Sequence, residues 1–472
     1  MQGMLNFAEK EEIVNFVSEK GIKILNLCHI PEDGRLKTLS FSATDKHRVY
    51  EILEFGERVD GSSLFSFIDP GKSDVYIMPQ LNRVFINPFS QIPTLNILCD
   101  YLDENGKLLE VSPKSVLVRA EEKLRSSAWV TLKALAELEF YIISKQKTEM
   151  LFPSVHDKNY HESAPFTEFE DLRNEVLTVL ADVGIATKYA HSEVGKILTK
   201  DGILMEQHEI ELMPQNLVEM AETIAITKWV IRNICAKHGV SASFSPKIFL
   251  EHAGNGMHIH LCGLKNGKNI TANPDGTLST ETLKMIGGIL RFASSLTSFG
   301  NPTPASYLRF IARKESPMHI CWSYRNRLAL IRIPLWWSFK KKTEENNNCR
   351  ETFEYRGPDP LANSYLLLAG ITVAIKYGLE NPKETIQIAE NLHVEETAKR
   401  RRLKNLPRSC YESAKNLRKD RKYYEADNVF PKILISKTID KLKAYKDKDL
   451  WKNLADKPEK IENLLKQYLH KG

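Results

Sequence analysis

Two glutamates, Glu137 and Glu139, stand two residues apart in a strongly apolar stretch from Ala134 to Ile143. In an extended strand, side chains two positions apart point to the same face, so both carboxylates would share one side of the strand. An exposed strand face is one interpretation, but the apolar flanks argue against full exposure. Buried like charges are destabilising unless a cation neutralises them, and Mg²⁺ and Mn²⁺ prefer carboxylate oxygens. The stretch therefore predicts a strand that contributes to a divalent-cation site.

A second chemically biased segment runs from Asn301 to Pro334. Five arginines alternate there with apolar residues, namely Arg309, Arg313, Arg325, Arg327 and Arg332. A guanidinium stays protonated and offers a fork of donors that fits carboxylate or phosphate oxygens. The segment predicts a site for a polyanion, with the carboxylate of Glu315 among the arginines. A surface ion-pair network is the alternative.

His258 and His260 would also share one strand face, directly after Gly254 and Gly256. A histidine pair is more often structural than ligating, but the glycines allow a ligand to approach the backbone closely. Further carboxylates in or beside strand-like segments are Glu193, Glu209, Glu211 and Glu354. Each of these alone is most simply a solvated side chain.

A chain of 472 residues is too long for one small core, so two domains or one large domain with an appendage are expected. Hydrophobic residues at 42% and charged residues at 27% are ordinary for a soluble globular protein. No apolar run approaches the roughly 18 residues that span a bilayer, and the first residues do not resemble a signal peptide. The seven cysteines are scattered without CxxC spacing, which predicts reduced thiols in a cytoplasm rather than a disulfide framework or a zinc site.

The net charge of +6 is modest, although basic residues concentrate between Lys399 and Lys471. Nucleic-acid binding is one interpretation of that region, but a solvated face of basic helices is the simpler one.

Turn signals and periodicity divide the chain near residue 112. Before it we expect a helix over 9–20, strands over 22–30 and 36–41, a strand pair over 73–79 and 83–89, and a hairpin of 94–102 with 107–111. Ser112-Pro113 begins a helix and marks the boundary. After it we expect strands over 129–143, 187–194 and 207–212, an alternating stretch over 247–264, and helices over 168–183, 216–237, 280–298 and 362–377.

Several motifs resemble, in chain order, the signature of the glutamine synthetase family. They are VDGSS at Asp60, Glu137-x-Glu139, HSEV at Glu193, EQHEI at Glu209, GMHIH at His258, Asn301-Pro302, Ser306-Tyr307, Arg309, Glu315-Ser-Pro317, Arg325-Asn-Arg327, Ile331-Arg-Ile-Pro334 and FEYRGPDP at Glu354. The resemblance implies an α+β fold, with an N-terminal β-grasp domain over 1–112. A catalytic domain over 113–472 would have a curved antiparallel sheet flanked by helices and a basic helical C-terminal region.

The resemblance also implies roles for the matching residues. One Mg²⁺ or Mn²⁺ ion would be held by Glu139, Glu193 and Glu209, and a second by Glu137, His258 and Glu354. Gly254, Arg309 and Arg356 would bind glutamate and the transferring phosphoryl group, and His260, Arg327 and Arg332 would bind ATP. Asp60 of a neighbouring subunit and Glu315 on a closing flap would take protons from ammonium.

The implied reaction is ATP-dependent ligation of ammonia to the γ-carboxylate of glutamate through γ-glutamyl phosphate, in a dodecamer of two hexameric rings. Departures are Ala253 in place of an asparagine, Thr352 in place of an arginine, and Cys262 in place of a serine. The segment between Glu193 and Glu209 is longer than the family pattern, so Glu206 and Glu211 remain alternative ligands. Two other functions stay open: a γ-glutamylamide synthetase that uses a polyamine or another amine, and a homologue that lost catalysis and serves as a structural or regulatory assembly.

Overall fold

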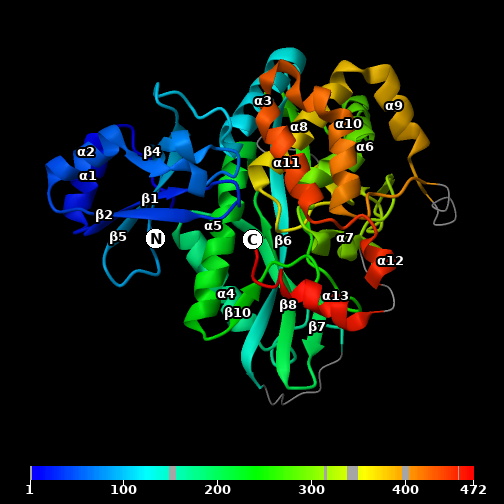
Figure 1. The fold of residues 1–472 in the computed structure, drawn as a ribbon, viewed down its shortest axis with the longest axis horizontal. Helices are drawn as coiled ribbons and strands as arrows, with labels where there is room; N and C mark the ends of the chain where they lie inside the picture. The colour runs from blue at the N-terminus through cyan, green and yellow to red at the C-terminus, as the bar shows by residue number, and fades with distance from the viewer. Residues whose placement is uncertain (1–2, 148–155, 313–315, 337–348, 396–402, 455–456) are drawn as a thin grey trace.

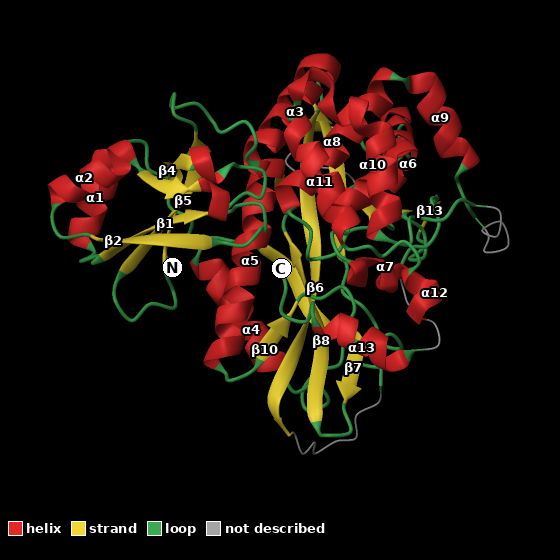
Figure 2. Ribbon diagram, viewed as in Figure 1, coloured by secondary structure: helices red, strands yellow, loops and turns green. Residues whose placement is uncertain are grey.

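The computed structural model describes residues 3–147, 156–312, 316–336, 349–395, 403–454 and 457–472. Two sheets organise these residues: a five-stranded sheet in the N-terminal part, at the left of Figure 1, and a ten-stranded sheet in the remainder. Helices and strands occupy separate layers (Figure 2), which confirms the predicted α+β class. None of the helices within these ranges combines the length and apolar character needed to cross a membrane.

The small sheet has the strand order β2-β1-β5-β4-β3, with β1 and β5 parallel and the other neighbours antiparallel. Its elements are α1 (Lys10–Glu19), β1 (Ile24–His29), β2 (Lys37–Ser42), α2 (Lys46–Phe55), β3 (Glu57–Asp60), β4 (Asp74–Ile86) and β5 (Thr94–Leu102). Leu25 and Leu27 of β1 pack with Ile13 of α1 and Ile52 of α2 in one apolar core. Cys28, on the opposite face, packs into the core of the larger part. This arrangement is the predicted β-grasp.

Two sequence expectations within this part are wrong. Residues 73–79 and 83–89 are not a pair of strands, because β4 runs continuously from Asp74 to Ile86 with a register shift against β5 between Pro79 and Val84. The extra residues turn toward the N-terminal stretch, where Phe7 N–H donates to Leu81 O at 3.0 Å. Residues 107–111 form no strand, since they share with the end of β5 only an isolated bridge between Leu108 and Leu102 and a hydrogen bond from Leu109 N–H to Tyr101 O at 2.8 Å.

A chain of charged side chains, half-buried except for the buried Glu222, joins the two parts of the molecule. Lys114 Nζ lies 2.7 Å from Asp100 Oδ1 and 3.0 Å from Glu222 Oε1. Arg83 Nε lies 2.7 Å from Glu222 Oε2. Arg83 and Asp100 belong to the small sheet, whereas Lys114 and the almost fully buried Glu222 belong to helices α3 (Pro113–Ala128) and α5 (Leu217–Lys237).

The large sheet has the order β13-β14-β15-β11-β6-β8-β7, with β9 and β10 paired to β6 and β12 paired to β11. Its strands are β6 (Thr131–Lys147), β7 (Thr187–Leu198), β8 (Ile203–Leu212), β9 (Gln215–Asn216), β10 (Ser241–Ser243), β11 (Met257–Lys265), β12 (Lys268–Asn269), β13 (Trp322–Tyr324), β14 (Ile331–Ile333) and β15 (Phe353–Tyr355). Neighbouring strands are antiparallel except β13 and β14. Along β6, Ala136, Leu138 and Phe140 enter the core, so Glu137 and Glu139 point to the opposite face.

Helices pack against this sheet and against each other. They are α3, α4 (Glu170–Asp182), α5, α6 (Thr280–Gly300), α7 (Pro304–Ile311), α8 (Ser364–Glu380), α9 (Pro382–Asn391), α10 (Cys410–Glu425), α11 (Lys432–Ala444), α12 (Leu450–Leu454) and α13 (Pro458–Lys466). The basic C-terminal helices are amphipathic: Leu434 and Ile439 of α11 are buried while Lys437 is exposed. Ile461 and Leu465 of α13 pack against Leu308 of α7. This supports the interpretation of a solvated basic helical face.

We predict that His29 makes the small domain sensitive to acid. Burial, with a smaller contribution from Lys37, lowers the pKa of His29 to about 4, and its Nδ1 lies 2.6 Å from the Tyr101 hydroxyl. A lowered histidine pKa leaves stability intact above the unfolded pKa of about 6.5, and that stability is lost as pH falls from there toward the folded value. Between pH 7.5 and pH 5 this group should cost about 2 kcal/mol of unfolding free energy. Denaturant unfolding of wild type and His29→Gln at both pH values checks this, since the variant should lose that much less; equal losses would contradict it.

Candidate active site

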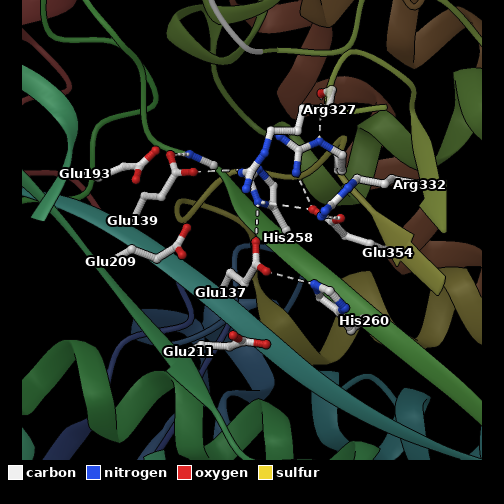
Figure 3. Close-up of polar contacts among 12 residues, drawn as sticks. Glu137, Glu139, Glu193, Glu209, Glu211, His258, His260, Arg327, Arg332 and Glu354 are labelled. Atoms are coloured by element: carbon white, nitrogen blue, oxygen red, sulfur yellow. Dashed lines mark hydrogen bonds and ion pairs between the residues drawn. The ribbon is translucent and has the colours of Figure 1, made fainter. Parts of the chain in front are cut away.

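A cavity of about 680 Å³ opens on the face of the large sheet away from its core. Its walls include β6, β7, β8, β11 and β14, together with α7 and the segments that flank β15. Figure 3 shows its polar floor, where acidic, histidine and arginine side chains from these elements converge. The strand that the sequence predicted around Glu137 thus lies at the centre of the cavity.

Carboxylates from two neighbouring strands face each other across this floor. Glu137 of β6 is opposite Glu211 of β8, and Glu139 is opposite Glu209. Glu193 of β7 is also buried on the cavity wall (Figure 3). Burial, and then the charges of these four neighbours, raise the pKa of Glu209 well above its usual range. A cluster of this kind fits hard divalent cations, because they remove the repulsion that otherwise opposes ionisation.

Two histidines complete the acidic cluster from the adjacent strand β11. His258 Nδ1 lies 2.8 Å from Glu137 Oε2, and His260 Nε2 lies 2.9 Å from Glu137 Oε1. His258 Nδ1 also lies 3.6 Å from Glu354 Oε1 on β15. Two groups of potential ligand atoms fall within 4.8 Å of one another: Glu137, His260 and Glu354, and Glu137, Glu209 and His258. The donor set therefore fits Mg²⁺ or Mn²⁺ through its oxygens and imidazole nitrogens.

Arginines face the carboxylates from the other side of the cavity. Arg332 Nη1 lies 2.7 Å from Glu354 Oε2, and Arg356 also pairs with Glu354. Arg332 Nε is buried and has no hydrogen-bond partner among the described residues. Arg309 of α7 is buried, and its Nη1 donates to the carbonyls of Gly357 and Pro358 at 3.0 and 3.2 Å. Arg327 lines the cavity and is exposed.

Glycines at the start of β11 let the strand pass close to these groups. A Cβ on Gly256 would lie 2.5 Å from His258 Nε2 and 2.6 Å from Arg309 Nη2, and its own N–H donates to Glu139 Oε2 at 2.6 Å. A Cβ on Gly254 would lie 2.4 Å from Pro246 O. Both positions therefore require glycine, as the sequence suggested.

The structure separates the three glutamates that the sequence left as alternatives on β8. Glu206 points to the opposite side of the sheet, where it is buried against Lys196 Nζ at 2.6 Å and Thr167 Oγ1 at 2.9 Å. Glu211 lines the cavity, but Lys188 Nζ lies 2.7 Å from its Oε1. Glu209 belongs to one of the two ligand groups. The geometry therefore favours Glu209.

Two predicted site residues, Asp60 and Glu315, are not seen among the described residues of the cavity, and one cavity residue, Gln207, was not predicted. Asp60 is not among the cavity residues; it lies on the small domain, where Ser62 and Ser63 hydroxyls donate to it at 2.7 and 2.6 Å. Glu315 lies outside the described residues. Sequence reasoning missed Gln207, whose Nε2 donates to Gly254 O at 3.1 Å; the alternation of β8 places it on the same face as Glu209 and could have revealed it.

The prediction that all cysteines are reduced is wrong for one pair. Cys262 and Cys349 form a disulfide, with Cα atoms 5.9 Å apart and a sequence separation of 87 residues. The pairing of β11 with β15 brings these distant segments together, which no local spacing could reveal. The other cysteines lie outside this bond.

Comparison with known proteins agrees with this geometry. Residues 110–464 match the model of the glutamine synthetase catalytic domain, and residues 21–104 match that of the glutamine synthetase β-grasp domain. This chain belongs to the glutamine synthetase family. Glutamine synthetase of Thermotoga maritima is 30% identical to it, over 90% of this chain and 94% of the relative. That of Thermococcus kodakarensis is 33% identical, over 86% of each.

Solved structures resemble this glutamine synthetase family member in fold. A cryo-electron microscopy structure of Plasmodium falciparum glutamine synthetase superposes with a TM-score of 0.81 at 20% identity, covering 96% of this chain and 98% of that one. A structure of apo GmaS without ligand gives 0.74 at 21% identity, with the same coverage. As a family member, the chain is an ATP-dependent ligase.

Proposed function

We propose that this ligase joins ammonia to the γ-carboxylate of glutamate through γ-glutamyl phosphate, giving glutamine, ADP and phosphate for glutamine biosynthesis. The observation that carries the proposal is the meeting of a carboxylate and histidine cluster with buried arginines in one cavity. A carboxylate is a poor acyl donor, so it must be activated by phosphorylation. Phosphoryl transfer needs positioning and neutralised charge more than covalent help.

The two halves of the floor would serve the metal ions. Glu139, Glu193 and Glu209 would hold one Mg²⁺ or Mn²⁺, and Glu137, His258 and Glu354 the other. When bound, such ions neutralise phosphate oxygens during transfer. The group of ligand atoms in the structure that contains both Glu137 and Glu354 includes His260, where the proposed second set has His258. We assign His260 to nucleotide binding instead.

The arginines would bind the anionic substrates. Arg327 and Arg332 would contact the phosphates of ATP, and the unpartnered Nε of Arg332 is a donor suited to this. Arg309, Arg356 and the backbone at Gly254 would orient glutamate. Because Arg309 also holds the carbonyls of Gly357 and Pro358, it would position the loop that carries Arg356.

Asp60 and Glu315 would handle the protons of ammonium. Hydrogen bonds from Ser63 and then Ser62 hold the pKa of Asp60 well below its usual range, so it stays ionised and can attract a cation. Because Asp60 does not line the cavity of its own chain, we assign it to the cavity of a neighbouring subunit, in a dodecamer of two hexameric rings in the cytoplasm.

Mixing two inactive variants tests this shared site. Asp60→Asn and Glu139→Gln should each lose activity by at least about 100-fold. Co-assembled in equal amounts, they should regain roughly a quarter of wild-type activity, because some sites then combine an intact Asp60 with an intact Glu139. Co-expression with two different tags, tandem purification and an activity assay measure this.

Homo-oligomers of each variant, carrying both tags and purified in the same way, are the control. No recovery in verified mixed assemblies would mean that Asp60 acts within its own chain or not at all.

Phosphate release from ATP tests the function itself. The protein is assayed with Mg²⁺ or Mn²⁺ and glutamate, first with ammonium and then with methylamine and polyamines, and the product is identified by mass. Ammonium should give the fastest turnover. Ala253, which lines the cavity where a larger polar side chain is usual for the family, favours another amine or acid as the second candidate. Turnover only with such a substrate would replace the proposal, and no turnover in a metal-binding assembly would favour a structural or regulatory role.

A further inference from the structure

The disulfide between Cys262 and Cys349 lies at the wall of the active-site cavity. Cys262 is fully buried on β11, four residues after His258, and Cys349 is among the residues that line the cavity. We propose that this bond is a thiol–disulfide exchange site, through which a dithiol reductant weakens the binding of nucleotide and metal ions. This inference rests on the proposed ATP-dependent function, because it assigns the nucleotide to this cavity.

The contacts around Cys349 connect the bond to the metal-binding floor. Thr352 Oγ1 lies 3.0 Å from His260 Nδ1, and His260 Nε2 lies 2.9 Å from Glu137 Oε1. The disulfide therefore anchors the short segment 349–352, which orients His260, which in turn orients Glu137. Groups that orient metal ligands in this way influence metal affinity strongly.

Among the described residues, side chains from β12 and from residue 336 also contact this segment. Asn269 Nδ2 donates to Glu351 O at 3.1 Å, and Trp336 Nε1 donates to Thr352 O at 3.1 Å. The strand that follows, β15, has only three residues. Opening the disulfide removes the covalent link to β11, so the segment gains conformational freedom that ligand binding must then remove.

The metal-binding side chains are already brought together when the disulfide is formed. With the bond closed, the cavity is open and His258, His260, Glu137 and Glu354 already converge. Reduction should therefore lower affinity rather than raise it. Disulfides in proteins of reducing compartments are usually transient or redox-sensing, which suits a bond placed beside the substrates.

Both cysteines are buried, but Cys349 lines the cavity, so access to the bond is through the cavity. A thiolate of the reductant attacks Cys349 Sγ, the S–S bond breaks, and Cys262 leaves as a thiolate that takes up a proton. The second thiol of the reductant then attacks the reductant's sulfur in the mixed disulfide, and Cys349 leaves as a thiolate that takes up a proton. Two electrons and two protons pass from the dithiol to the protein, and the reductant becomes a disulfide.

The test compares the full chain before and after treatment with dithiothreitol. Alkylation under denaturing conditions followed by mass measurement should label five cysteines before reduction and seven after it. Calorimetry with ADP and Mn²⁺ should show about tenfold weaker binding after reduction. Bound ADP should also slow the reduction, since it covers the route to Cys349.

Variants separate this effect from general damage. Cys262→Ser/Cys349→Ser should bind ADP as weakly as reduced wild type, with or without dithiothreitol. Cys235→Ala, a buried cysteine on α5 outside the bond, should respond to reduction as wild type does. Thermal unfolding of each form shows whether it is folded.

Equal ADP and Mn²⁺ affinity in the oxidised and reduced wild type would overturn this inference and leave the proposed function intact. Seven labelled cysteines in the untreated protein would also overturn it. Failure of both forms to bind ADP and Mn²⁺ at all would overturn the proposed function together with this inference.

Discussion

Replacing Glu209 by glutamine should stabilise the metal-free protein and abolish its response to Mn²⁺. The Glu209 carboxylate is buried opposite Glu139, and burial together with four neighbouring carboxylates raises its pKa well above the usual range. Removing the charge relieves this repulsion, which should add about 1 kcal/mol to the unfolding free energy without metal. It also deletes a proposed ligand, so Mn²⁺ affinity and turnover should fall by at least about 100-fold.

Thermal unfolding with and without Mn²⁺ measures both effects at once. Ions at about 100 times their dissociation constant should stabilise wild type by ~2.7 kcal/mol and the variant hardly at all. Glu211→Gln is a matched control, because it makes the same change two residues along β8 and in the same cavity. It should keep the response to Mn²⁺ but lose stability, since Lys188 loses its partner. The reverse pattern would move the ligand role from Glu209 to Glu211.

Replacing Arg356 by lysine should lower kcat/KM by about 100- to 1000-fold, the range seen when a single preorganised donor to a developing charge is lost. The Arg356 side chain is buried, pairs with Glu354, and donates from Nε to Arg327 O at 3.0 Å. Lysine keeps the charge but concentrates it at one atom, so it cannot serve Glu354, Arg327 and a substrate oxygen together. Steady-state kinetics with glutamate and ATP varied in turn measure the loss.

Arg325→Lys provides the comparison for this change. Arg325 lies in the arginine-rich segment 301–334 that precedes Arg356, but it is exposed and does not line the cavity. Its substitution should leave kcat/KM within about twofold, as for most surface changes. Comparable losses in the two variants would show that a change from arginine to lysine is harmful even outside the cavity, and would remove the special role we give Arg356.

The parts of the site that could be predicted are those in which local sequence fixes the direction of a side chain. Alternation along a strand places Glu137 with Glu139 and His258 with His260, and the structure puts all four around one floor. The same rule applied to β8 narrows its ligand to Glu209 or Glu211 and removes Glu206. It cannot choose between the first two, because that choice depends on Lys188 from the neighbouring strand.

What could not be predicted depends on contacts between distant segments. The disulfide joins residues that only the pairing of β11 with β15 brings together. The single long strand β4 looked like two strands, because its irregular middle pairs with the N-terminal residues rather than with β5. The proposed place of Asp60 in a site depends on a second chain, which no property of one chain reveals.

The charged side chains that join the two parts of the molecule limit how this enzyme can be divided into fragments. Glu222 receives its counter-charge from Lys114, which the larger part supplies, and from Arg83, which the small sheet supplies. A fragment beginning at residue 113 would keep the acid and lose half of its partners, a loss that costs about 3–5 kcal/mol when a buried pair is broken. A minimal catalytic fragment must therefore begin upstream of β4 and keep the β-grasp domain together with the active site.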